Sequence, residues 1–209
     1  MIHPNTQIRI VSEEIGYGVF ATEFIPAGTI VYVKDLLEVE VTQSAFAILP
    51  LALQEVVNKY SYIDEHGVRI VSWDFAKYVN HCCQPNTMST GYGFEIALRD
   101  IQAGEEITDE YALFNLEEDM SLSCSKPGCR GRVSPVDVDL YAQQWDQQIR
   151  RVLDKVFDLP QPLLPFIDPQ TVASLHDYRA NPEHYRSVRR LKYEPAAGNH
   201  VQKDRLALP

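Results

Sequence analysis

Two polar stretches hold the residues that could carry chemistry in this chain. The first is residues 79–86, Val-Asn-His-Cys-Cys-Gln-Pro-Asn, and the second is residues 103–111, Ala-Gly-Glu-Glu-Ile-Thr-Asp-Glu-Tyr. Their amide, imidazole, thiol, carboxyl and phenol groups can hydrogen-bond a ligand, bind a metal or exchange a proton. Taken separately, each stretch is a polar turn beside an apolar run. The ordinary interpretation is then structural: a loop-capping amide at Asn80, a buried imidazole at His81 and a core phenol at Tyr111.

Taken together and in this order, the two stretches resemble the core motifs of the SET-domain protein-lysine methyltransferases, N-H-S-C-x-P-N and G-E-E-L-T-x-D-Y. The matches have Cys82 in place of serine, Ile107 in place of leucine and Glu110 in place of aspartate. Residues 16–21, Gly-Tyr-Gly-Val-Phe-Ala, look like the family's G-x-G-x-F/Y-A segment, and residues 25–28 match its I-x-x-G turn. The resemblance covers roughly residues 8–133, and all its segments come in the family's order.

The resemblance implies a mainly β fold with short helices. In this SET-domain fold, small antiparallel sheets surround a threaded (pseudo-knot) active site, where the first polar stretch passes beneath the loop that carries Tyr111. A helical C-terminal extension follows. We expect a SET domain at residues 1–120, a partial post-SET-like segment at residues 121–133, and the helical extension with a mobile tail at residues 134–209.

The resemblance also implies an activity: transfer of a methyl group from S-adenosyl-L-methionine (SAM) to the ε-amine of a lysine in a protein. Gly16, Tyr17 and Gly18 would approach SAM through backbone groups, where a missing Cβ helps. Asn80 would hydrogen-bond the amino-acid portion of SAM. His81 would contact the adenine mainly through its backbone.

Tyr111 is the residue that the resemblance assigns to catalysis. Methyl transfer is an in-line displacement by a neutral amine, so the enzyme must align the amine and deliver it unprotonated. Burial beside a cationic sulfonium lowers the pKa of a lysine. A phenol at the inner end of a substrate channel can then orient the amine, and we expect Tyr62 and Asp109 to belong to the same channel.

Asp109 departs from the family pattern, because many relatives have Phe or Tyr two residues before the catalytic tyrosine, where it limits how many methyl groups fit. If Asp109 points into the channel, its carboxylate favours a charged ammonium, which opposes attack unless another group takes the proton. If it points to solvent, it is a polar surface residue. The sequence leaves both alternatives open, and with them the number of methyl groups added.

A zinc site is the second chemistry that the resemblance raises. Residues 124–131 resemble the post-SET pattern C-x-C-x-x-x-x-C-R-G, and Cys83 matches the cysteine that completes its zinc site. Leu122 occupies the position of one ligand, which leaves three thiolates, Cys83, Cys124 and Cys129. Structural zinc usually takes four ligands in a tetrahedron. The alternatives are one zinc with a fourth ligand that is not cysteine, or three ordinary thiols.

The composition of the chain limits the kinds of partner and the cell compartment that we expect for it. The formal net charge of −10 argues against a surface that follows nucleic-acid phosphates and suits a basic partner, although an acidic surface without a partner is common. No apolar run is long enough to span a membrane, and the N-terminus does not resemble a signal peptide. Four cysteines, two of them adjacent, do not form a disulfide framework. We therefore expect an intracellular protein that binds a Lys-bearing protein or peptide, without nucleic-acid or membrane binding.

The surrounding elements are mostly short strands and turns. Alternating or β-branched residues predict five strands, at residues 8–10, 29–33, 60–63, 68–71 and 94–98, and residues 16–21 are predicted as a turn running into apolar residues. Helical spacing at residues 44–59, interrupted by Pro50, predicts two short helices, and Asp74 is expected to cap another.

The chain changes character after residue 133. Helices are predicted at residues 139–157, after Asp168, and from residue 181, the last one carrying Tyr185, Val188 and Leu191. The pattern does not alternate strand with helix, and no G-x-G-x-x-G follows a strand, which excludes a Rossmann cofactor site.

Two other functions stay open at this point. One is a SAM-dependent enzyme that acts on a small-molecule amine or another non-protein acceptor, an alternative supported by Asp109 and by the lack of a reader or nuclear-targeting segment. The other is a non-catalytic interaction module that retains the fold. The presence of both Asn80 and Tyr111 argues against the module.

Overall fold

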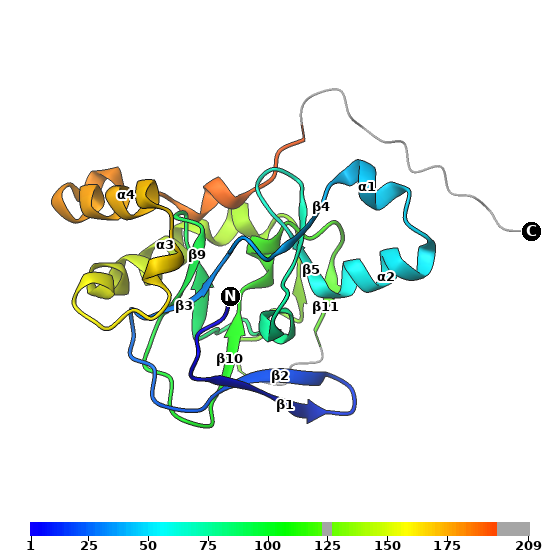
Figure 1. Cartoon of the computed structure of the whole chain (residues 1–209), viewed down its shortest axis with the longest axis horizontal. Helices are drawn as coiled ribbons and strands as arrows, with labels where there is room; N and C mark the ends of the chain where they lie inside the picture. The colour runs from blue at the N-terminus through cyan, green and yellow to red at the C-terminus, as the bar shows by residue number, and fades with distance from the viewer. Residues whose placement is uncertain (123–126, 196–209) are drawn as a thin grey trace, which may run out of the picture.

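The computed structural model describes residues 1–122 and 127–195 (Figure 1). An N-terminal antiparallel hairpin joins β1 (Thr6–Ser12) to β2 (Gly16–Ala21). Residues 16–21 are therefore a strand and not the predicted turn. Only Gly16 has the turn conformation, with φ of 83°, because the hairpin reverses there and a residue without a Cβ adopts that angle at no steric cost.

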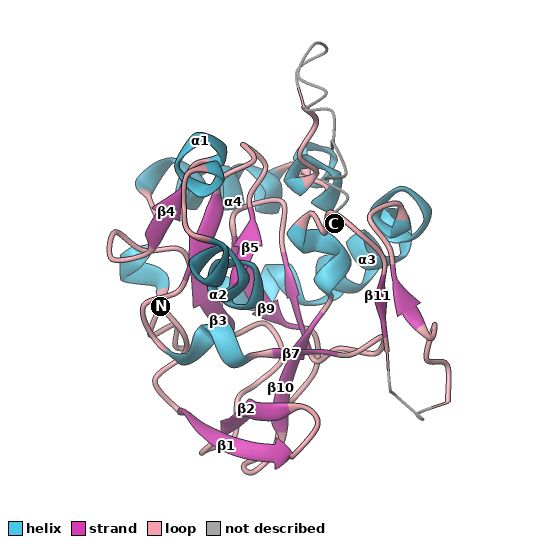
Figure 2. Cartoon of the chain, turned by 90° about the vertical axis from the view of Figure 1, so that its right-hand side faces the viewer, coloured by secondary structure: helices cyan, strands magenta, loops and turns pink. Residues whose placement is uncertain are grey.

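The two polar stretches meet as neighbouring strands. β7 (Asn80–His81) pairs in parallel with β10 (Glu106–Asp109), and β10 pairs on its other edge with β2. The resulting sheet has the order β1-β2-β10-β7. Figure 2 shows β10 running from the hairpin up to β7. The pairing places Asn80 opposite Thr108 and His81 opposite Asp109, so it fixes the relative position of the two motifs.

Small sheets make up the rest of the β structure, as predicted. One has the order β3-β9-β8 and contains β3 (Ile30–Val33), β9 (Phe94–Ala97) and β8 (Thr87–Ser89). A second has the order β4-β6-β5 and contains β4 (Val39–Val41), β6 (Arg69–Val71) and β5 (Ser61–Ile63). The hairpin of β11 (Met120–Ser121) and β12 (Arg132–Val133) completes the set among the described residues.

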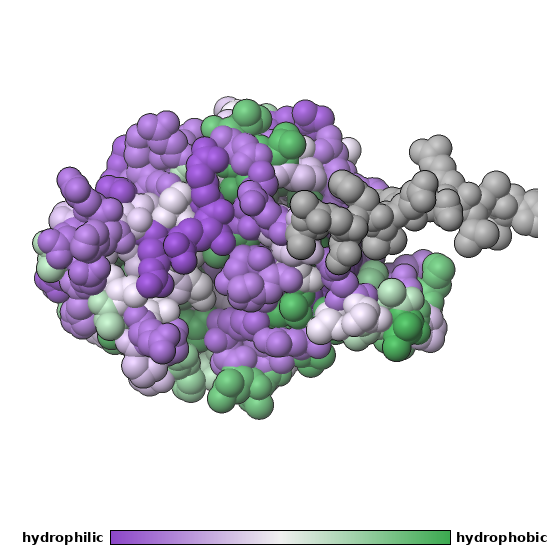
Figure 3. Space-filling model, turned by 90° about the horizontal axis from the view of Figure 1, so that it is seen from above, coloured by the Kyte–Doolittle hydropathy of each residue, from purple (hydrophilic) through white to green (hydrophobic). Residues whose placement is uncertain are grey.

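The first two helices stand out from the body of the protein (Figure 1). α1 (Gln43–Ala47) and α2 (Leu51–Tyr60) are separated at Pro50, which confirms the predicted break. Within the described part of the chain neither helix buries a residue, and Ile48 and Leu51 are exposed. Figure 3 shows apolar side chains gathered on this side of the molecule. These helices therefore gain little stability from burial.

Two 3-10 turns border the site. η1 (Phe75–Tyr78) is capped by Asp74, as predicted, and precedes β7. η2 (Tyr111–Phe114) follows β10 and is capped by the side chain of Glu110, which accepts a hydrogen bond from the Ala112 N–H. Tyr111 is thus fixed at the first position of a capped turn.

The C-terminal part packs against the β3-β9-β8 sheet. It contains α3 (Asp137–Leu153), η3 (Asp154–Phe157), η4 (Leu164–Phe166), α4 (Pro169–Ala180), η5 (Pro182–His184) and η6 (Val188–Leu191). Trp145 and Ile149 of α3 share one hydrophobic core with Phe94 and Ile96 of β9. The division of the chain at residues 120 and 133 stays a prediction. The predicted mobile tail lies almost entirely in residues 196–209, outside the described residues.

The predicted third helix beginning at residue 181 is wrong. The segment forms two short 3-10 turns, η5 and η6, with extended backbone at Tyr185 between them. The carboxylate of Asp146 on α3 explains the difference, because it accepts hydrogen bonds from the Tyr185 hydroxyl, the Ser187 hydroxyl and the Val188 N–H. Those three contacts hold the segment against α3 in a conformation that a continuous helix could not reach.

Candidate active site

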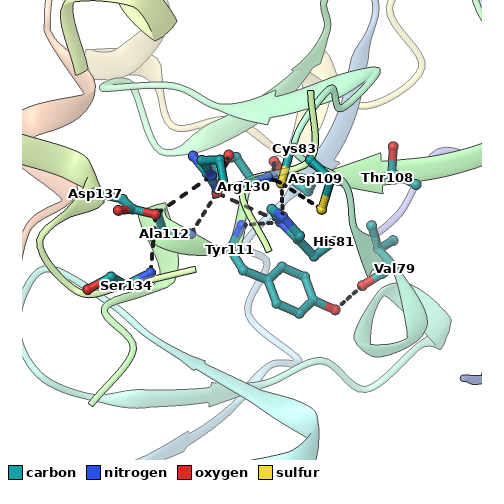
Figure 4. A network of polar contacts seen from close by, with 12 residues as sticks. Val79, His81, Cys83, Thr108, Asp109, Tyr111, Ala112, Arg130, Ser134 and Asp137 are labelled. Atoms are coloured by element: carbon teal, nitrogen blue, oxygen red, sulfur yellow. Dashed lines mark hydrogen bonds and ion pairs between the residues drawn. The ribbon is translucent and has the colours of Figure 1, made fainter. Parts of the chain in front are cut away.

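Tyr111 lies directly over the first polar stretch. Its hydroxyl donates a hydrogen bond to the Val79 carbonyl at 2.6 Å, and its backbone N–H reaches Nδ1 of His81 at 3.3 Å (Figure 4). Residues 79–81 therefore pass beneath the loop that carries Tyr111, as the resemblance implies. The crossing places the phenol next to the Asn80–His81 pair.

Burial determines the protonation states of His81 and Tyr111. Burial, with the nearby cation of Arg130, lowers the pKa of His81 to about 4, so the imidazole is neutral at physiological pH. Its Nδ1 then accepts the Tyr111 N–H, which assigns the ring proton to Nε2, facing the Cys83 sulfur at 3.4 Å. Burial also raises the pKa of Tyr111, and the phenol remains protonated.

A cavity of about 370 Å³ opens beside the Tyr111 ring. Its wall includes five aromatic rings, those of Tyr32, Tyr60, Tyr62, Tyr111 and Phe114. The rings are in contact: the centroids of Tyr62 and Phe114 are 5.5 Å apart, and those of Tyr111 and Phe114 are 5.4 Å apart. This volume is within the range of ligand pockets, and rings in this arrangement can enclose an aliphatic chain that carries a cation.

Asp109 lies neither in solvent nor alone. Its side chain is fully buried next to Glu95 of β9, and Glu95 lines the cavity. The alternative of a polar surface residue is thereby excluded. Tyr62, the other residue expected in the channel, lies in the cavity wall between Tyr32 and Phe114.

The Gly-Tyr-Gly segment of β2 lies against the other motif residues. The Asn80 side-chain amide donates to the Tyr17 carbonyl at 3.1 Å and to Glu106 Oε1 at 2.8 Å. A Cβ on Gly18 would lie 2.5 Å from Glu106 Oε1 and 3.0 Å from Asn80 Nδ2, closer than packed atoms tolerate. A side chain at position 18 would therefore displace the ends of Glu106, Val11 and Asn80 from their present positions. An amide and a carboxylate side by side, next to open backbone, fit a ligand with an amino-acid group such as SAM.

Comparison with known proteins supports this geometry, since residues 16–112 match the family model of the SET domain. Residues 16–112 of this chain form a SET domain. The matched range begins at Gly16 and ends at Ala112, so it contains both polar stretches and Tyr111. None of the helices described in this structure is long and apolar enough to cross a membrane.

Several curated proteins resemble the chain in and around its SET domain. It is 32% identical over 136 residues to a variant-silencing SET domain-containing protein of Plasmodium falciparum (isolate 3D7), covering 56% of this chain and 5% of that protein. It is 39% identical over 71 residues to the histone H3-lysine(4) N-trimethyltransferase ATX1 of Arabidopsis thaliana, covering 31% of this chain and 7% of that protein. The chain thus spans only a small part of the length of these relatives.

A similar solved structure is that of KRYPTONITE in complex with mCHG DNA and SAH. It is 22% identical, with a TM-score of 0.44, over 63% of this chain and 29% of that one. The expectation that this chain does not bind nucleic acid stays a prediction.

An ion pair that no sequence pattern predicts ties the SET domain to the residues after it. The Glu110 carboxylate is fully buried and accepts hydrogen bonds from Arg130 at 2.7 and 2.9 Å. The Arg130 guanidinium also lies 3.7 Å from Asp137 of α3 (Figure 4). It lies 5.2 Å from the Tyr141 ring of the same helix. Burial raises the pKa of Glu110, although Arg130 acts to lower it. The one signal for this ion pair in the sequence is the Cys-Arg-Gly triplet at residues 129–131, whose arginine follows a candidate zinc ligand.

The candidate zinc ligands are partly visible. Sγ of Cys83 and Sγ of Cys129 are 4.0 Å apart, close to the separation of about 3.8 Å that two thiolates have on one tetrahedral zinc. Backbone N–H groups of Arg130 and Gly131 point at these sulfurs, each at 3.4 Å. The third predicted ligand, Cys124, lies outside the described residues. The positions of Cys83 and Cys129 fit two of the four ligands of a tetrahedral zinc, and zinc binding stays a prediction.

Proposed function

We propose that this chain is a SAM-dependent protein-lysine N-methyltransferase. The position of Tyr111 carries the proposal, because its phenol is held on the Val79 carbonyl at 2.6 Å, between an aromatic cavity and the Asn80–Gly18 contact. The family match at residues 16–112 supports it. So does the name of the A. thaliana relative, a histone H3-lysine(4) N-trimethyltransferase.

The cofactor side of the site consists of Asn80, Glu106 and the backbone of residues 16–18. When bound, SAM supplies the methyl group. The Asn80 amide group is held by Tyr17 and Glu106, which leaves its oxygen available to accept from an α-ammonium group. The Glu106 carboxylate places a negative charge beside the same α-ammonium group. The residues of the chain on this side bind SAM and orient it.

The acceptor side consists of the aromatic cavity. Tyr60, Tyr62 and Phe114 surround the space that a lysine side chain would occupy. The Tyr111 hydroxyl donates to Val79, so its lone pairs are available to accept an amine N–H and fix the direction of the nitrogen. Alignment of this kind supplies much of the rate increase in a displacement reaction.

The acidic composition supports a protein acceptor. A net charge of −10 attracts a lysine-rich peptide and does not favour a neutral small molecule. We include in the proposal an intracellular location, where histone-like and other basic proteins and SAM are both present.

Incubation of the protein with methyl-labelled SAM and a panel of acceptors tests the proposal. The panel contains histones, ribosomal proteins and small amines. The control variant is Tyr193→Phe, because the Tyr193 hydroxyl accepts a hydrogen bond from Gln43 and Tyr193 does not line the cavity. We expect label on lysine in at least one protein with wild type and with Tyr193→Phe. Label confined to small amines would replace the proposal by the small-molecule alternative. No transfer by protein that binds SAM would indicate an interaction module.

A further inference from the structure

The unusual feature of the cavity is a half-buried acid in its wall, Glu95, with a fully buried acid, Asp109, beside it. Glu95 is the one acidic side chain of β9, and Asp109 ends β10. The two carboxyl groups are close enough for each to act on the pKa of the other. Two negative charges side by side and away from water repel each other, so the pair binds one proton.

The hydrogen-bond inventory assigns this proton. Oδ1 of Asp109 accepts the Glu110 N–H at 2.6 Å, as a carboxylate does. Oδ2 of Asp109 is buried and has no hydrogen-bond partner of normal geometry among the described residues, although the Ser89 N–H is close enough to the carboxyl to act to lower its pKa. A protonated Glu95 supplies the missing donor. Burial, and then the charge of Asp109, raise the pKa of Glu95 well above its usual range, which agrees with this assignment.

Glu95 also connects two spaces. It lines the 370 Å³ cavity beside Tyr111, and it lines a second cavity of about 170 Å³. The second cavity reaches the exposed side chains of Glu65 and His66. An acid in this position contacts both the space for the reacting amine and a route toward solvent.

Other charged and titratable groups surround the pair. Those that act on it directly are Tyr62 of β5, Tyr111 of η2, the adjacent Glu110 and the amino group of Met1. The walls of the two cavities add Lys34, Lys59, Asp64, Glu65, His66, Arg69, Lys77 and Glu117. The cations on the reaction-side wall favour loss of a proton from an incoming ammonium.

We propose that Glu95 and Asp109 act together as the general base that deprotonates the substrate lysine. The proposal rests on the proposed function and adds two catalytic groups to it. The ammonium donates one N–H to the cavity-side oxygen of Glu95. As that proton arrives, Glu95 passes its own proton to Oδ2 of Asp109.

Charge and atoms balance in this relay. The lysine nitrogen changes from a cation to a neutral amine with a free electron pair, which becomes the nucleophile. The acid pair changes from one negative charge to none. After methyl transfer, the extra proton leaves through the second cavity, and the pair returns to its singly charged state. Asp109 therefore need not hold the amine charged, as its position in the sequence alone would suggest.

The test is a pH profile of methyl transfer under single-turnover conditions for wild type, Glu95→Gln and Glu183→Gln. Glu183 lies exposed in η5 and provides the matched acid-to-amide control. We expect Glu95→Gln to lower the rate about a hundredfold near neutral pH, in the range of lost general base catalysis. The deficit should shrink to about tenfold or less near pH 10, where free lysine deprotonates in solution. Glu183→Gln should match wild type throughout.

A purely structural role for Glu95 predicts a deficit in the rate that does not depend on pH. A deficit that is the same at every pH, or no deficit at all, would overturn the proposal. Thermal stabilisation by S-adenosylhomocysteine (SAH) in each variant verifies that the site is folded. If Glu95→Gln does not fold, Asp109→Asn is the second variant, because an amide cannot take the relayed proton and should give the same pH-dependent loss.

One measurement needs no turnover. Infrared spectra of the SAH-bound protein at neutral pH should show a protonated carboxylic acid that Glu95→Gln removes. Persistence of that band in the variant would contradict the shared proton, whatever the activity. Failure of wild type to methylate any protein would instead contradict the proposed function, so the two failures are distinguishable.

Discussion

The two sides of β10 at its C-terminal end compensate buried carboxyl groups in different ways. Glu110 faces the segment after the SET domain, where Arg130 donates two hydrogen bonds to it. Asp109 faces the cavity side, where it meets Glu95, a second acid. Asp109 ends β10 and Glu110 follows it with extended backbone, so the two adjacent side chains point to opposite sides and serve two sites. A cation fixes one acid in place, whereas a proton, which can move, balances the other.

The largest effect is expected on the Arg130 side. Arg130→Met leaves the Glu110 carboxylate buried without its cation, which typically costs about 3 to 5 kcal/mol in the free energy of unfolding. The loss should diminish as the pH is lowered, because protonated Glu110 carries no uncompensated charge. Denaturant unfolding at neutral and acidic pH measures both effects.

Arg132→Met is the control for that change. Arg132 pairs with Asp119, and both side chains are about half exposed or more, so the loss should be about 1 kcal/mol or less. Equal losses of unfolding free energy in the two variants would mean that the buried ion pair of Arg130 with Glu110 stabilises the fold no more than an exposed pair does.

On the cavity side, the largest effect concerns Tyr111. Tyr111→Phe removes the hydroxyl and keeps the ring packed against His81 and Phe114, so SAM binding and the fold should be retained. Methyl transfer should fall by about a hundredfold or more, as for other oriented polar groups at a reacting centre. Rates with labelled SAM, beside the Tyr193→Phe control, measure it. Full activity in Tyr111→Phe would refute the role assigned to the phenol.

The acid pair should also affect stability with pH. The folded state raises the pKa of both Glu95 and Asp109, so their contribution to stability is fully present below about pH 4 and is lost as pH rises through the raised values. Relative to wild type, Glu95→Gln should therefore gain stability with pH, by about 1 to 3 kcal/mol near pH 8. Parallel stability curves for the two proteins between about pH 4 and pH 8 would show that the pair carries no extra proton.

The sequence predicts some of the contacts around β10 and misses others, for a physical reason. The prediction that the Asn80 stretch lies under Tyr111 came from the family resemblance, which the two motifs in their order carry. Glu95 was not predicted, since a polar residue inside Phe-Glu-Ile-Ala reads as the solvent side of an alternating strand. Only the tertiary structure shows that β10 and the aromatic rings cover that side. The ion pair of Glu110 with Arg130 joins residues on separate segments, which no local pattern reveals.

The smallest effect is expected from the candidate zinc. One zinc per chain, held by Cys83, Cys124, Cys129 and a fourth ligand, would tie the same segment that Arg130 already holds. Removal by a chelator should lower the melting temperature modestly and leave the SET domain folded. Elemental analysis of protein purified without chelator gives the stoichiometry. Zinc that survives Cys124→Ser and Cys129→Ser together would show that the ligands are elsewhere.

The parallel pairing of β7 with β10 has a kinetic consequence. These two-residue contacts form only after the chain between them has closed into a loop and the β8–β9 hairpin has taken its place. Asn80 and Tyr111 should therefore reach their working positions in the same late event of folding. In partly folded molecules neither Asn80 nor Tyr111 would be in place. Such molecules would therefore not bind the cofactor without also being able to use it.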